Sequence, residues 1–543
     1  PKHRGTNGRP RPNTARVTNV VKPPCDEGVI RSAAAHAPCV RAIGFWVLAA
    51  TILGSSMAFI DGTVVSVALP VLQTDLGATV SELQWIVESY ALFLAALLLI
   101  GGSLGDRFGR RLVFAIGVGV FAVASMWCGL VSNARELIIA RAVQGVGAAL
   151  LVPGSLAIIS ASFSEKQRGQ AIGTWSGFTA ITAALGPVLG GWLVESYSWR
   201  WVFYINAPIA VAVLTILFWR VPESRNDESS GSLDWVGAAL ATFGLGALVF
   251  GLIESANPAV GSTIVRAGLV LGGVALLAFL IVEATSRAPM MPLRLFRSRT
   301  FTGANILTLF LYSALSGPLF FLPFNLIQVQ GYSATAAGGA FLPLILIIFL
   351  LSRWAGSVMD RFGPKLPLVV GPTIAAVGYT LFTLPGVGGS YWTTFFPAVV
   401  VLGTGMAISV APLTTAVMGA VEARHAGLAS GINNSVSRTA GLISVAVMGV
   451  LVLGAFNTEL DRRLEGVALK PETREALDAE RVMLAAAQSP EGLEVGTTAR
   501  IETAIDEAFV FGFRRIMFVA CGLALASALT ALVWIEGRPN TAS

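Results

Sequence analysis

Charged residues are scarce in this sequence, and long apolar runs take their place. Only 13% of the 543 residues are charged, 54% are hydrophobic, and the mean hydropathy is +0.72. Such values lie outside the range of ordinary soluble domains. The composition therefore predicts an all-α polytopic membrane protein embedded in a lipid bilayer. The net charge of +6 arises mainly in short loops and the N-terminal tail, so we expect no binding to nucleic acid.

The sequence also lacks the groups that most enzymes and pumps use. It has no Gly-x4-Gly-Lys-Ser/Thr loop for a nucleotide, and its four cysteines show no metal-binding spacing. The three histidines, His3, His36 and His425, lie in predicted tails or loops. We therefore expect no enzymatic activity, no metal and no cofactor, and we expect an ion gradient to supply any energy that transport needs.

Long apolar runs are abundant. A membrane-spanning helix needs about 20 apolar residues, and about fourteen segments meet this requirement. The predicted spans are 43–69, 81–103, 112–131, 135–160, 168–194, 200–220, 234–254, 264–284, 301–326, 335–358, 366–386, 391–418, 431–456 and 511–535.

A short loop sequence occurs twice between these spans. Residues 102–111 read GSLGDRFGRR and residues 356–365 read GSVMDRFGPK, so Asp360 follows Asp106 by 360 − 106 = 254 positions. That offset is too long for six helices and fits eight. The repeat therefore predicts a chain of two related six-helix bundles with two helices inserted between them, as in many secondary transporters.

The repeat and the polar segments divide the chain. We expect a disordered basic cytoplasmic tail, an N-terminal bundle, the inserted helices with their linkers, a C-terminal bundle and a short cytoplasmic tail. Their predicted limits are 1–41, 42–220, 221–300, 301–535 and 536–543, with a polar extracellular loop at 457–509 inside the C-terminal bundle.

Loop charges indicate the orientation in the membrane. If the N-terminus is cytoplasmic, the loops on that side carry most of the arginines and lysines, whereas the short loops on the other side carry little beyond Arg135, Arg200 and Arg266. This asymmetry follows the positive-inside rule. It predicts a multi-pass protein of the bacterial cell membrane with both termini in the cytoplasm.

Three ionisable residues stand out inside the predicted spans. A charge at mid-bilayer costs about 2.5–3.5 kcal/mol even on the lenient insertion scale, so such residues usually have a function. Asp61, Glu88 and Arg141 lie seven to nine residues from the outer ends of their spans, which is about 10–13 Å of depth. Burial favours a protonated carboxyl group, while a nearby guanidinium favours the ionised form. Two carboxyl groups and one arginine at one depth thus predict a proton-exchange site.

Structural roles remain open for these three residues. Asp61 and Glu88 can instead face an aqueous vestibule without coupling to protons, and Arg141 can simply neutralise one of them. Arg438, inside the span 431–456, has no assigned role.

A proton carrier needs carboxyl groups. The polar groups in the predicted spans of the second half are amides instead, and these spans also contain several aromatic residues. A cavity with few fixed charges and many aromatic faces suits amphipathic or cationic organic molecules. The residues expected to line such a cavity are Gln144, Tyr90, Phe310, Tyr312 and Asn325. The alternative is that the aromatic residues face lipid.

The span 168–194 contains glycines four residues apart. One pair is Gly173 and Gly177, and a second set reads Gly186-Pro187-Val188-Leu189-Gly190-Gly191. Such spacing removes side chains from one stripe of a helix and lets another helix pack closely, while proline loosens the backbone ladder. We expect a hinge and close contact at the second set, and ordinary tight packing at the first pair.

Taken together, these stretches resemble the major facilitator superfamily, and specifically its fourteen-spanner drug:proton antiporters. Residues 105–111 resemble the superfamily signature between helices 2 and 3, and 141–145 resemble its helix 4 motif. Residues 186–191 resemble the antiporter motif of helix 5, and 61–70 are similar to the fourteen-spanner signature of helix 1. Three positions depart from the patterns: Ser66 stands for the usual Asn, Thr182 for Gly and Pro364 for a basic residue.

The resemblance implies roles for these motifs. Proton coupling falls to the helix 4 arginine, antiport to Gly186, Pro187, Gly190 and Gly191, and gating to the loop between helices 2 and 3. The implied gating residues in the two copies of that loop are Gly105, Asp106, Arg107, Gly109, Arg110, Arg111, Asp360, Arg361 and Gly363.

The sequence therefore predicts a proton-driven exporter of lipophilic or cationic small molecules that works as a monomer by alternating access. One alternative is a dedicated exporter of a single metabolite or antibiotic with the same fold. A sensor or scaffold that does not transport is another alternative, and a membrane-embedded enzyme lacks the necessary side chains.

Overall fold

The computed structural model describes residues 41–225, 234–257, 259–286, 289–422, 425–465, 467, 469–490 and 492–537. The predicted N-terminal tail up to residue 40 and residues 538–543 of the predicted C-terminal tail lie outside these ranges. The described chain contains 13 helices long and apolar enough to cross a membrane, and a shorter apolar helix at Lys365–Leu381. Together they match all of the predicted spans, and they confirm the all-α membrane fold.

The first half of the chain builds six spans from seven helices. These are α2 (Arg41–Leu76), α3 (Val80–Phe108), α4 (Arg110–Leu130), α5 (Ala134–Ser162), α6 (Glu165–Ser196), α7 (Trp201–Tyr204) and α8 (Asn206–Arg220). Polar caps set where the spans begin. Thr79 and Glu82 form a capping box at the start of α3, and Asn133 accepts a hydrogen bond from the Glu136 amide at the start of α5.

Helix α5 lies in the centre of the first bundle, against α3 and α4. Glycines make this close approach possible, because a Cβ at Gly145 would come within 2.4 Å of the Tyr90 carbonyl oxygen. A Cβ at Gly147 would come within 2.5 Å of the Phe121 amide nitrogen. Small residues let helix backbones pack without intervening side chains. The polar side chains of α5 therefore lie within a tightly packed bundle.

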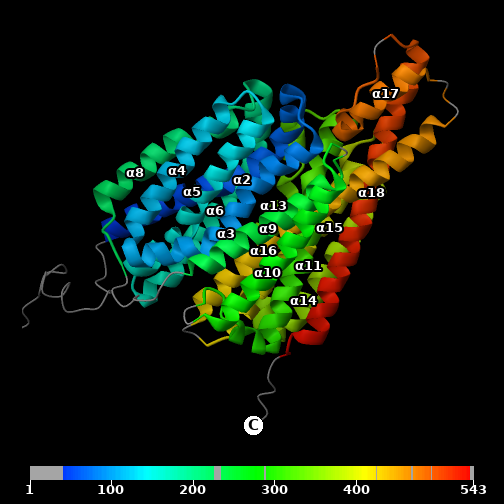
Figure 1. Cartoon of the computed structure of the whole chain (residues 1–543). Helices are drawn as coiled ribbons and strands as arrows, with labels where there is room; N and C mark the ends of the chain where they lie inside the picture. The colour runs from blue at the N-terminus through cyan, green and yellow to red at the C-terminus, as the bar shows by residue number, and fades with distance from the viewer. Residues whose placement is uncertain are drawn as a thin grey trace, which may run out of the picture.

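Two inserted spans, α9 and α10, follow the first half, and the second half begins after them. The elements are α9 (Trp235–Glu254), α10 (Ser262–Thr285), η1 (Leu293–Arg297), α11 (Arg299–Phe324), the π-helical η2 (Asn325–Val329), α12 (Ala334–Gly339), α13 (Leu342–Phe362), α14 (Lys365–Leu381), α15 (Tyr391–Gly419), α16 (Ala426–Leu464), α17 (Pro471–Glu480), η4 (Arg481–Ala486) and α18 (Val495–Trp534). Helix α9 packs on α10, α3 and α16, so the inserted pair lies over the seam between the two halves (Figure 1).

Helix ends differ from the predicted limits where helices extend beyond the apolar core. Helix α2 continues to Leu76 rather than ending near 69, and α14 ends at Leu381 rather than near 386. The largest correction concerns the predicted loop 457–509. It shrinks to 465–494, because α16 continues to Leu464 and α18 begins at Val495. Hydropathy detects only the apolar part of a helix, whereas these polar turns are held by tertiary contacts.

The connection between α16 and α18 contains α17 and projects beyond the other helices at one end of the molecule (Figure 1). Arg481 fastens it to α16, since its Nη2 donates to Asp461 Oδ1 at 2.5 Å and its Nε to Asp478 Oδ1 at 2.8 Å. Leu477 and Leu484 are each 1% exposed, so their buried side chains hold the segment against the rest of the protein. We call the end of the molecule that carries this segment the α17 end, and the opposite end, where α3 meets α4, the Asp106 end.

Candidate functional site

A buried polar cluster joins α2 to α5 inside the first bundle. Arg141 Nη1 donates to Asp61 Oδ2 at 2.5 Å and to Gln144 Oε1 at 2.7 Å. Gln144 Nε2 donates to Asp61 Oδ1 at 2.8 Å, which closes the triangle. The three side chains are 0–1% exposed. Because Arg141 and Gln144 are three residues apart on one helix, α5 presents both groups on the face that meets Asp61.

Helix α3 completes the environment of the arginine. Arg141 Nε donates to the backbone carbonyl of Ile86 at 3.1 Å, and its guanidinium lies 4.3 Å from the ring centroid of Tyr90. Ile86 and Tyr90 are four residues apart and share one face of the helix. The charge of Arg141 is thus stabilised by a carboxylate, an amide, a carbonyl and an aromatic ring.

The geometry of the cluster indicates its charge state. Both oxygens of Asp61 accept hydrogen bonds, one from the Arg141 guanidinium and one from the Gln144 amide nitrogen, and neither of these groups can accept a hydrogen bond in return. A carboxyl group that only accepts hydrogen bonds has the pattern of an ionised carboxylate. In a buried ion pair of this kind, each charge is stabilised only while the other is present. Removing one partner of such a pair typically costs about 3–5 kcal/mol, because the other charge is left uncompensated.

Glu88 lies on α3 but outside this cluster. Two residues separate it from Ile86 and from Tyr90, and a helix turns about 200° over two residues, so Glu88 faces away from Arg141. Its side chain is 1% exposed, and Oε2 has no hydrogen-bond partner among the described residues. The structure therefore brings Asp61 and Arg141 together and places Glu88 on the opposite face of α3.

That face of α3 forms part of the wall of a cavity between the two halves. The cavity has a volume of about 610 Å³ and is bounded by α2, α3 and α6 of the first half and by α11, α13 and α16 of the second. Its charged lining residues are Glu88 and Arg438, on facing halves. The remaining lining consists of aliphatic residues, hydroxyl and amide groups and three aromatic rings. Its polar and aromatic members are Thr63, Ser66, Ser316, Ser437, Asn434, Tyr312, Phe320 and Phe341.

Of the five residues predicted to line a substrate cavity, Tyr312 is the one that lines this space. Gln144 and Tyr90 belong to the cluster around Arg141. Asn325 lies in η2, where its Oδ1 accepts a hydrogen bond from Gln330 Nε2 at 3.2 Å. Phe310 is half-buried on α11, outside the lining. The depth of these residues in the membrane was predictable from the helix limits, but the direction in which each side chain points was not.

The second glycine set of α6 lies where three helices meet. A Cβ at Gly186 would come within 2.0 Å of the Thr63 Oγ1 atom of α2, and a Cβ at Gly191 within 2.2 Å of the Ala334 carbonyl oxygen of α12. Helix α6 thus packs without side chains against its own bundle and against the second half. Pro187 also lines the cavity, so this crossing borders the space between the halves.

The first glycine pair does not pack in this way. A Cβ at Gly173 or at Gly177 would meet nothing within 4 Å. The expectation of tight packing at this pair is therefore wrong, because this stretch of α6 faces open space rather than a neighbouring helix.

The first copy of the repeated loop forms a tight turn at the Asp106 end. Gly109 ends α3 with a φ of +114°, a conformation that L side chains rarely adopt. Asp106 Oδ1 accepts from Arg110 Nε at 2.8 Å and from Arg110 Nη2 at 2.8 Å. The carboxylate of Glu223, which sequence reasoning missed, accepts from the backbone amide of Arg111 at 2.9 Å.

Glu223 acts as the N-terminal cap of α4. Its second oxygen accepts from the Leu112 amide at 3.1 Å, and Ser224 accepts from the Arg110 amide at 2.8 Å through its carbonyl. A carboxylate at a helix N-terminus satisfies free amides and interacts favourably with the helix dipole. The turn between α3 and α4 is thereby fixed to the segment that follows α8.

The second copy repeats part of this geometry. Gly363 follows α13 with a φ of +77°, at the position that corresponds to Gly109. Arg361 lies 5.3 Å from the ring centroid of Phe362, as Arg107 lies 5.6 Å from that of Phe108. The side chain of Asp360 lies outside the described residues.

Hydrogen bonds join the two halves at the α17 end. Gln73 of α2 accepts from Gln328 Nε2 at 2.9 Å and donates through Nε2 to the Met483 carbonyl at 3.0 Å. Glu195 at the end of α6 accepts from the Thr335 backbone amide at 3.1 Å. These contacts join the two halves on the α17 side of the cavity.

The part of the chain that the structure describes contains no group of three or more His, Cys, Asp and Glu side chains able to hold a metal ion. What it does contain is a pair of helical bundles around a central cavity, with a charged cluster packed directly behind the cavity wall. That arrangement defines a membrane transporter with two related halves.

The family follows from comparison with known proteins. The family model described as Major Facilitator Superfamily matches residues 51–445, so the chain belongs to this superfamily, whose members are transporters rather than enzymes. Two bacterial relatives illustrate the similarity. The tetracenomycin C resistance and export protein of Streptomyces glaucescens is 32% identical over 514 residues, covering 94% of this chain and 95% of that protein. The multidrug resistance protein Stp of Mycobacterium tuberculosis is 34% identical over 433 residues, covering 79% of this chain and 80% of the relative.

Solved structures share the fold. A bacterial homologue of the human lysosomal transporter Spinster, in its inward-facing and unoccupied conformation, aligns with a TM-score of 0.64 at 18% sequence identity. The alignment covers 92% of this chain and all of that chain. The major facilitator fold predicted from the sequence motifs is thus confirmed.

Proposed function

We propose that this protein exports lipophilic or cationic small molecules from a bacterial cell in exchange for protons. The names of the two relatives, a resistance and export protein and a multidrug resistance protein, support export of toxic compounds. The central cavity, bounded by both halves, supports alternating access.

One observation carries the proposal. Glu88 lies in the wall of the cavity with a carboxyl oxygen that has no partner among the described residues. A buried carboxyl group of this kind binds a proton readily, and a bound organic cation would stabilise its ionised form instead. Proton and substrate therefore compete for one group, which is the physical basis of exchange.

Asp61 has a different part in the proposed cycle. It is held as a carboxylate by Arg141 and Gln144 while the α17 end is closed. Protonation would remove the charge that Arg141 compensates and free the guanidinium to change its contacts. Because residues 62 and 63 of α2 line the cavity, a rearrangement at Asp61 is transmitted directly to the cavity wall.

The proposed cycle links these two carboxyl groups to the closure of the cavity. With the α17 end open, Asp61 and Glu88 take up protons from outside. With that end closed, as in this structure, they release protons to the cytoplasm and the cavity accepts substrate. A membrane potential of about 150 mV supplies about 3.5 kcal/mol per net charge moved, so exchange of one proton for an uncharged substrate can sustain a concentration ratio of a few hundredfold. Exchange of one proton for a monovalent cation moves no net charge, so the pH gradient alone drives it.

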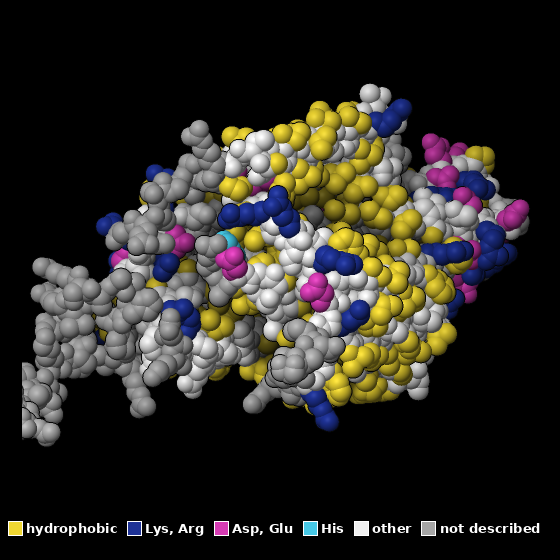
Figure 2. Space-filling view, turned by 90° about the horizontal axis from the view of Figure 1, so that it is seen from below, with side chains coloured by type: hydrophobic (Ala, Val, Ile, Leu, Met, Phe, Trp, Pro, Cys, Tyr) yellow, Lys and Arg dark blue, Asp and Glu magenta, His cyan; other side chains and the backbone are white. Residues whose placement is uncertain are grey.

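The proposed orientation puts the Asp106 end and both termini in the cytoplasm. Seen from below, basic side chains lie scattered over this face together with a few acidic ones (Figure 2). The orientation itself is proposed from the positive-inside rule applied to the loop charges. The segment containing α17 then lies outside the cell.

The cavity suggests the chemistry of the substrate. Its acidic group lies on the α3 wall and its basic group on the α16 wall, with aromatic and aliphatic side chains around them. An amphipathic molecule whose cationic group lies beside Glu88 would match this polarity, and its rings would stack on the aromatic side chains. We propose a monomer as the working unit, because the cavity lies within one chain.

Uptake of a fluorescent cation into inverted vesicles with an acidic lumen tests the function, because the cytoplasmic face of an inverted vesicle is on the outside. We expect the wild type to transport the dye, a gradient collapser to stop transport, and Asp61→Asn and Glu88→Gln to reduce it at least tenfold. Glu475→Gln, an exposed carboxyl group on α17, is the matched control and should transport normally. Transport that continues after both the pH gradient and the membrane potential are collapsed would refute proton coupling.

A dedicated exporter of one compound is the second candidate. The relative that matches 94% of this chain carries the name of a single antibiotic, which favours this reading. A panel of chemically unrelated dyes and antibiotics separates the two candidates. Transport of several members supports broad specificity, whereas resistance to one compound alone supports the dedicated exporter.

A further inference from the structure

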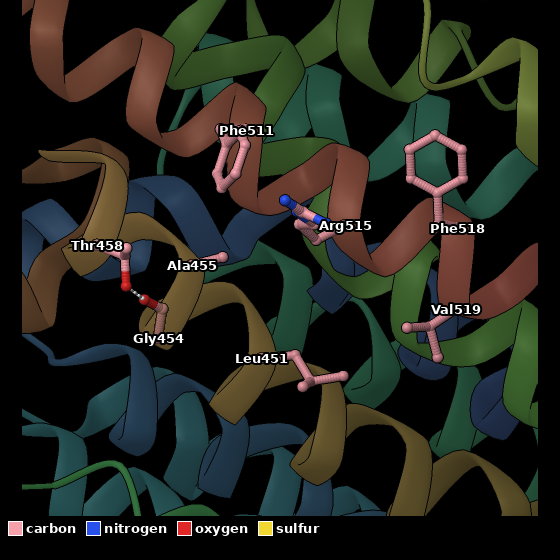
Figure 3. A pocket seen from close by; sticks show the side chains of 8 residues that line it. All are labelled: Leu451, Gly454, Ala455, Thr458, Phe511, Arg515, Phe518 and Val519. Carbon is pink, nitrogen blue, oxygen red and sulfur yellow. Dashed lines mark hydrogen bonds between the residues drawn. The ribbon is translucent and has the colours of Figure 1, made fainter. Parts of the chain in front are cut away.

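A second cavity lies on the outer surface of the second half, between α16 and α18. It is an open groove with a volume of about 480 Å³ (Figure 3). Gly454 lines the groove without a side chain. A Cβ at this position would meet nothing within 4 Å, so the space in front of it is open. The groove is separate from the central cavity, with which it shares no lining residue.

Contacts of the neighbouring arginine fix the depth of this groove in the membrane. Arg514 Nη2 donates to the carbonyls of Leu384 at 3.4 Å and Pro385 at 2.9 Å, in the turn between α14 and α15. Arg515 follows it on α18 and is about 1.5 Å away along the helix axis. Arg515 therefore lies level with an interhelical turn at the α17 end, which is the depth of lipid headgroups.

The charged group of the groove lies toward this end, and the deeper part of the groove is apolar. Thr458 of α16 and Phe511 of α18 are at the shallow end, where the guanidinium of Arg515 lies against the Phe511 ring. Leu451, Phe518 and Val519 line the deep end and are 39%, 57% and 38% exposed. Because the two helices are antiparallel, both contribute apolar side chains at the same depth. The groove thus has the polarity of a lipid molecule, with a charged head above and an acyl chain below.

Arg515 also has an unmatched charge. Its guanidinium lies 4.8 Å from the ring centroid of Phe511, and it forms no hydrogen bond or ion pair with the described part of the chain. By contrast, Arg462 and Arg463 at the end of α16 both pair with Glu459. An exposed arginine on a lipid-facing helix needs an anion, and the phosphate group of a lipid is the anion available at this depth.

We propose that this groove binds one anionic phospholipid from the leaflet on the α17 side, with its phosphate on Arg515 and an acyl chain along Leu451, Phe518 and Val519. This site goes beyond the proposed export function and does not depend on it.

Native mass spectrometry of the purified, delipidated full chain, titrated with phosphatidylglycerol, tests the site. Loss of one basic contact at a membrane surface predicts about fivefold weaker binding of the tightest lipid to Arg515→Gln. Arg515→Lys keeps the charge and should bind normally, which excludes misfolding as the cause. Gly454→Leu fills the groove without touching the protein interior and should also weaken binding, because it occupies the space of the acyl chain.

Matched controls define the outcomes. Arg135→Gln removes an exposed arginine elsewhere at the α17 end, and Gly273→Leu adds a side chain to another exposed glycine, so neither should change the affinity. Equal losses in Arg515→Gln and Arg135→Gln would overturn the proposal, because they indicate general electrostatic attraction. So would equal binding of phosphatidylglycerol and phosphatidylcholine, or Arg515-dependent binding of glycerol phosphate as tight as that of the lipid.

Discussion

The stability of the Asp61–Arg141 pair provides the sharpest test of the site geometry. Arg141→Gln would leave the carboxylate of Asp61 in a position that is 0% exposed, without the cation that compensates it. Breaking a buried pair in this way costs about 3–5 kcal/mol. The double variant Asp61→Asn/Arg141→Gln removes both charges, so it should recover much of this stability while transport stays absent.

A second arginine–aspartate pair, whose aspartate also lies on α2, supplies the control. Arg200 Nη1 lies 3.3 Å from Asp75 Oδ2, and these side chains are 36% and 47% exposed. An exposed pair contributes about 0–1 kcal/mol, so Arg200→Gln should be nearly neutral.

Heating each purified variant in detergent and measuring the fraction that stays monodisperse ranks the four proteins. We expect wild type and Arg200→Gln to be the most stable, the double variant to be intermediate, and Arg141→Gln to be the least stable. If Arg141→Gln is as stable as Arg200→Gln, or if the double variant is less stable than Arg141→Gln alone, the description of a buried, mutually compensating pair is wrong.

Three further predictions concern packing and closure. Gly186→Ala places a Cβ 2.0 Å from a side-chain oxygen of α2 and should cost about 1–3 kcal/mol of thermal stability and reduce efflux, whereas Gly177→Ala on the same helix should match the wild type. Glu223→Ala removes the acceptor of two backbone amides, so detergent stability should fall by about 0.5–2 kcal/mol, and wild-type stability would contradict its role as a cap. Cysteines at Gln73 and Gln328, joined by a short bifunctional maleimide in a chain without other cysteines, should stop dye efflux; efflux that persists after complete cross-linking would show that the α17 end need not open.

Most of the fold was predictable from the sequence because a bilayer imposes a length on every apolar run. Each predicted span contains a helix, and even the shorter one, Lys365–Leu381, was found from its composition. What composition does not determine is where a helix stops once it leaves the bilayer. The polar turns of α16 up to Leu464 and of α18 from Val495 are held by contacts such as that of Arg463 with Glu507, which join residues far apart in the sequence.

For the site residues, the depth in the membrane was predictable from the sequence, but the direction in which each side chain points was not. Counting residues from the span ends put Asp61, Glu88 and Arg141 in one layer, but it did not show that Glu88 turns away from the other two. The spacing did contain a signal for Gln144, which lies three residues from Arg141 and therefore on its face. Glu223 gave no signal at all, since its partner Arg111 is more than a hundred residues away in the sequence and the contact exists only in the folded bundle.

The separation of the two carboxyl groups has a consequence for coupling. If both lay in the cavity, a bound cation could replace both protons without any change in the helices. Asp61 instead lies behind the wall, where its charge state is tied to Arg141, and Arg141 is tied to the Ile86 carbonyl of α3, two residues from Glu88. In the proposed exchange, substrate therefore competes directly at Glu88, whereas a change at Asp61 shifts α2 or α5 relative to α3. The proposed exchange thus assigns substrate competition to one carboxyl group and the helix movement to the other.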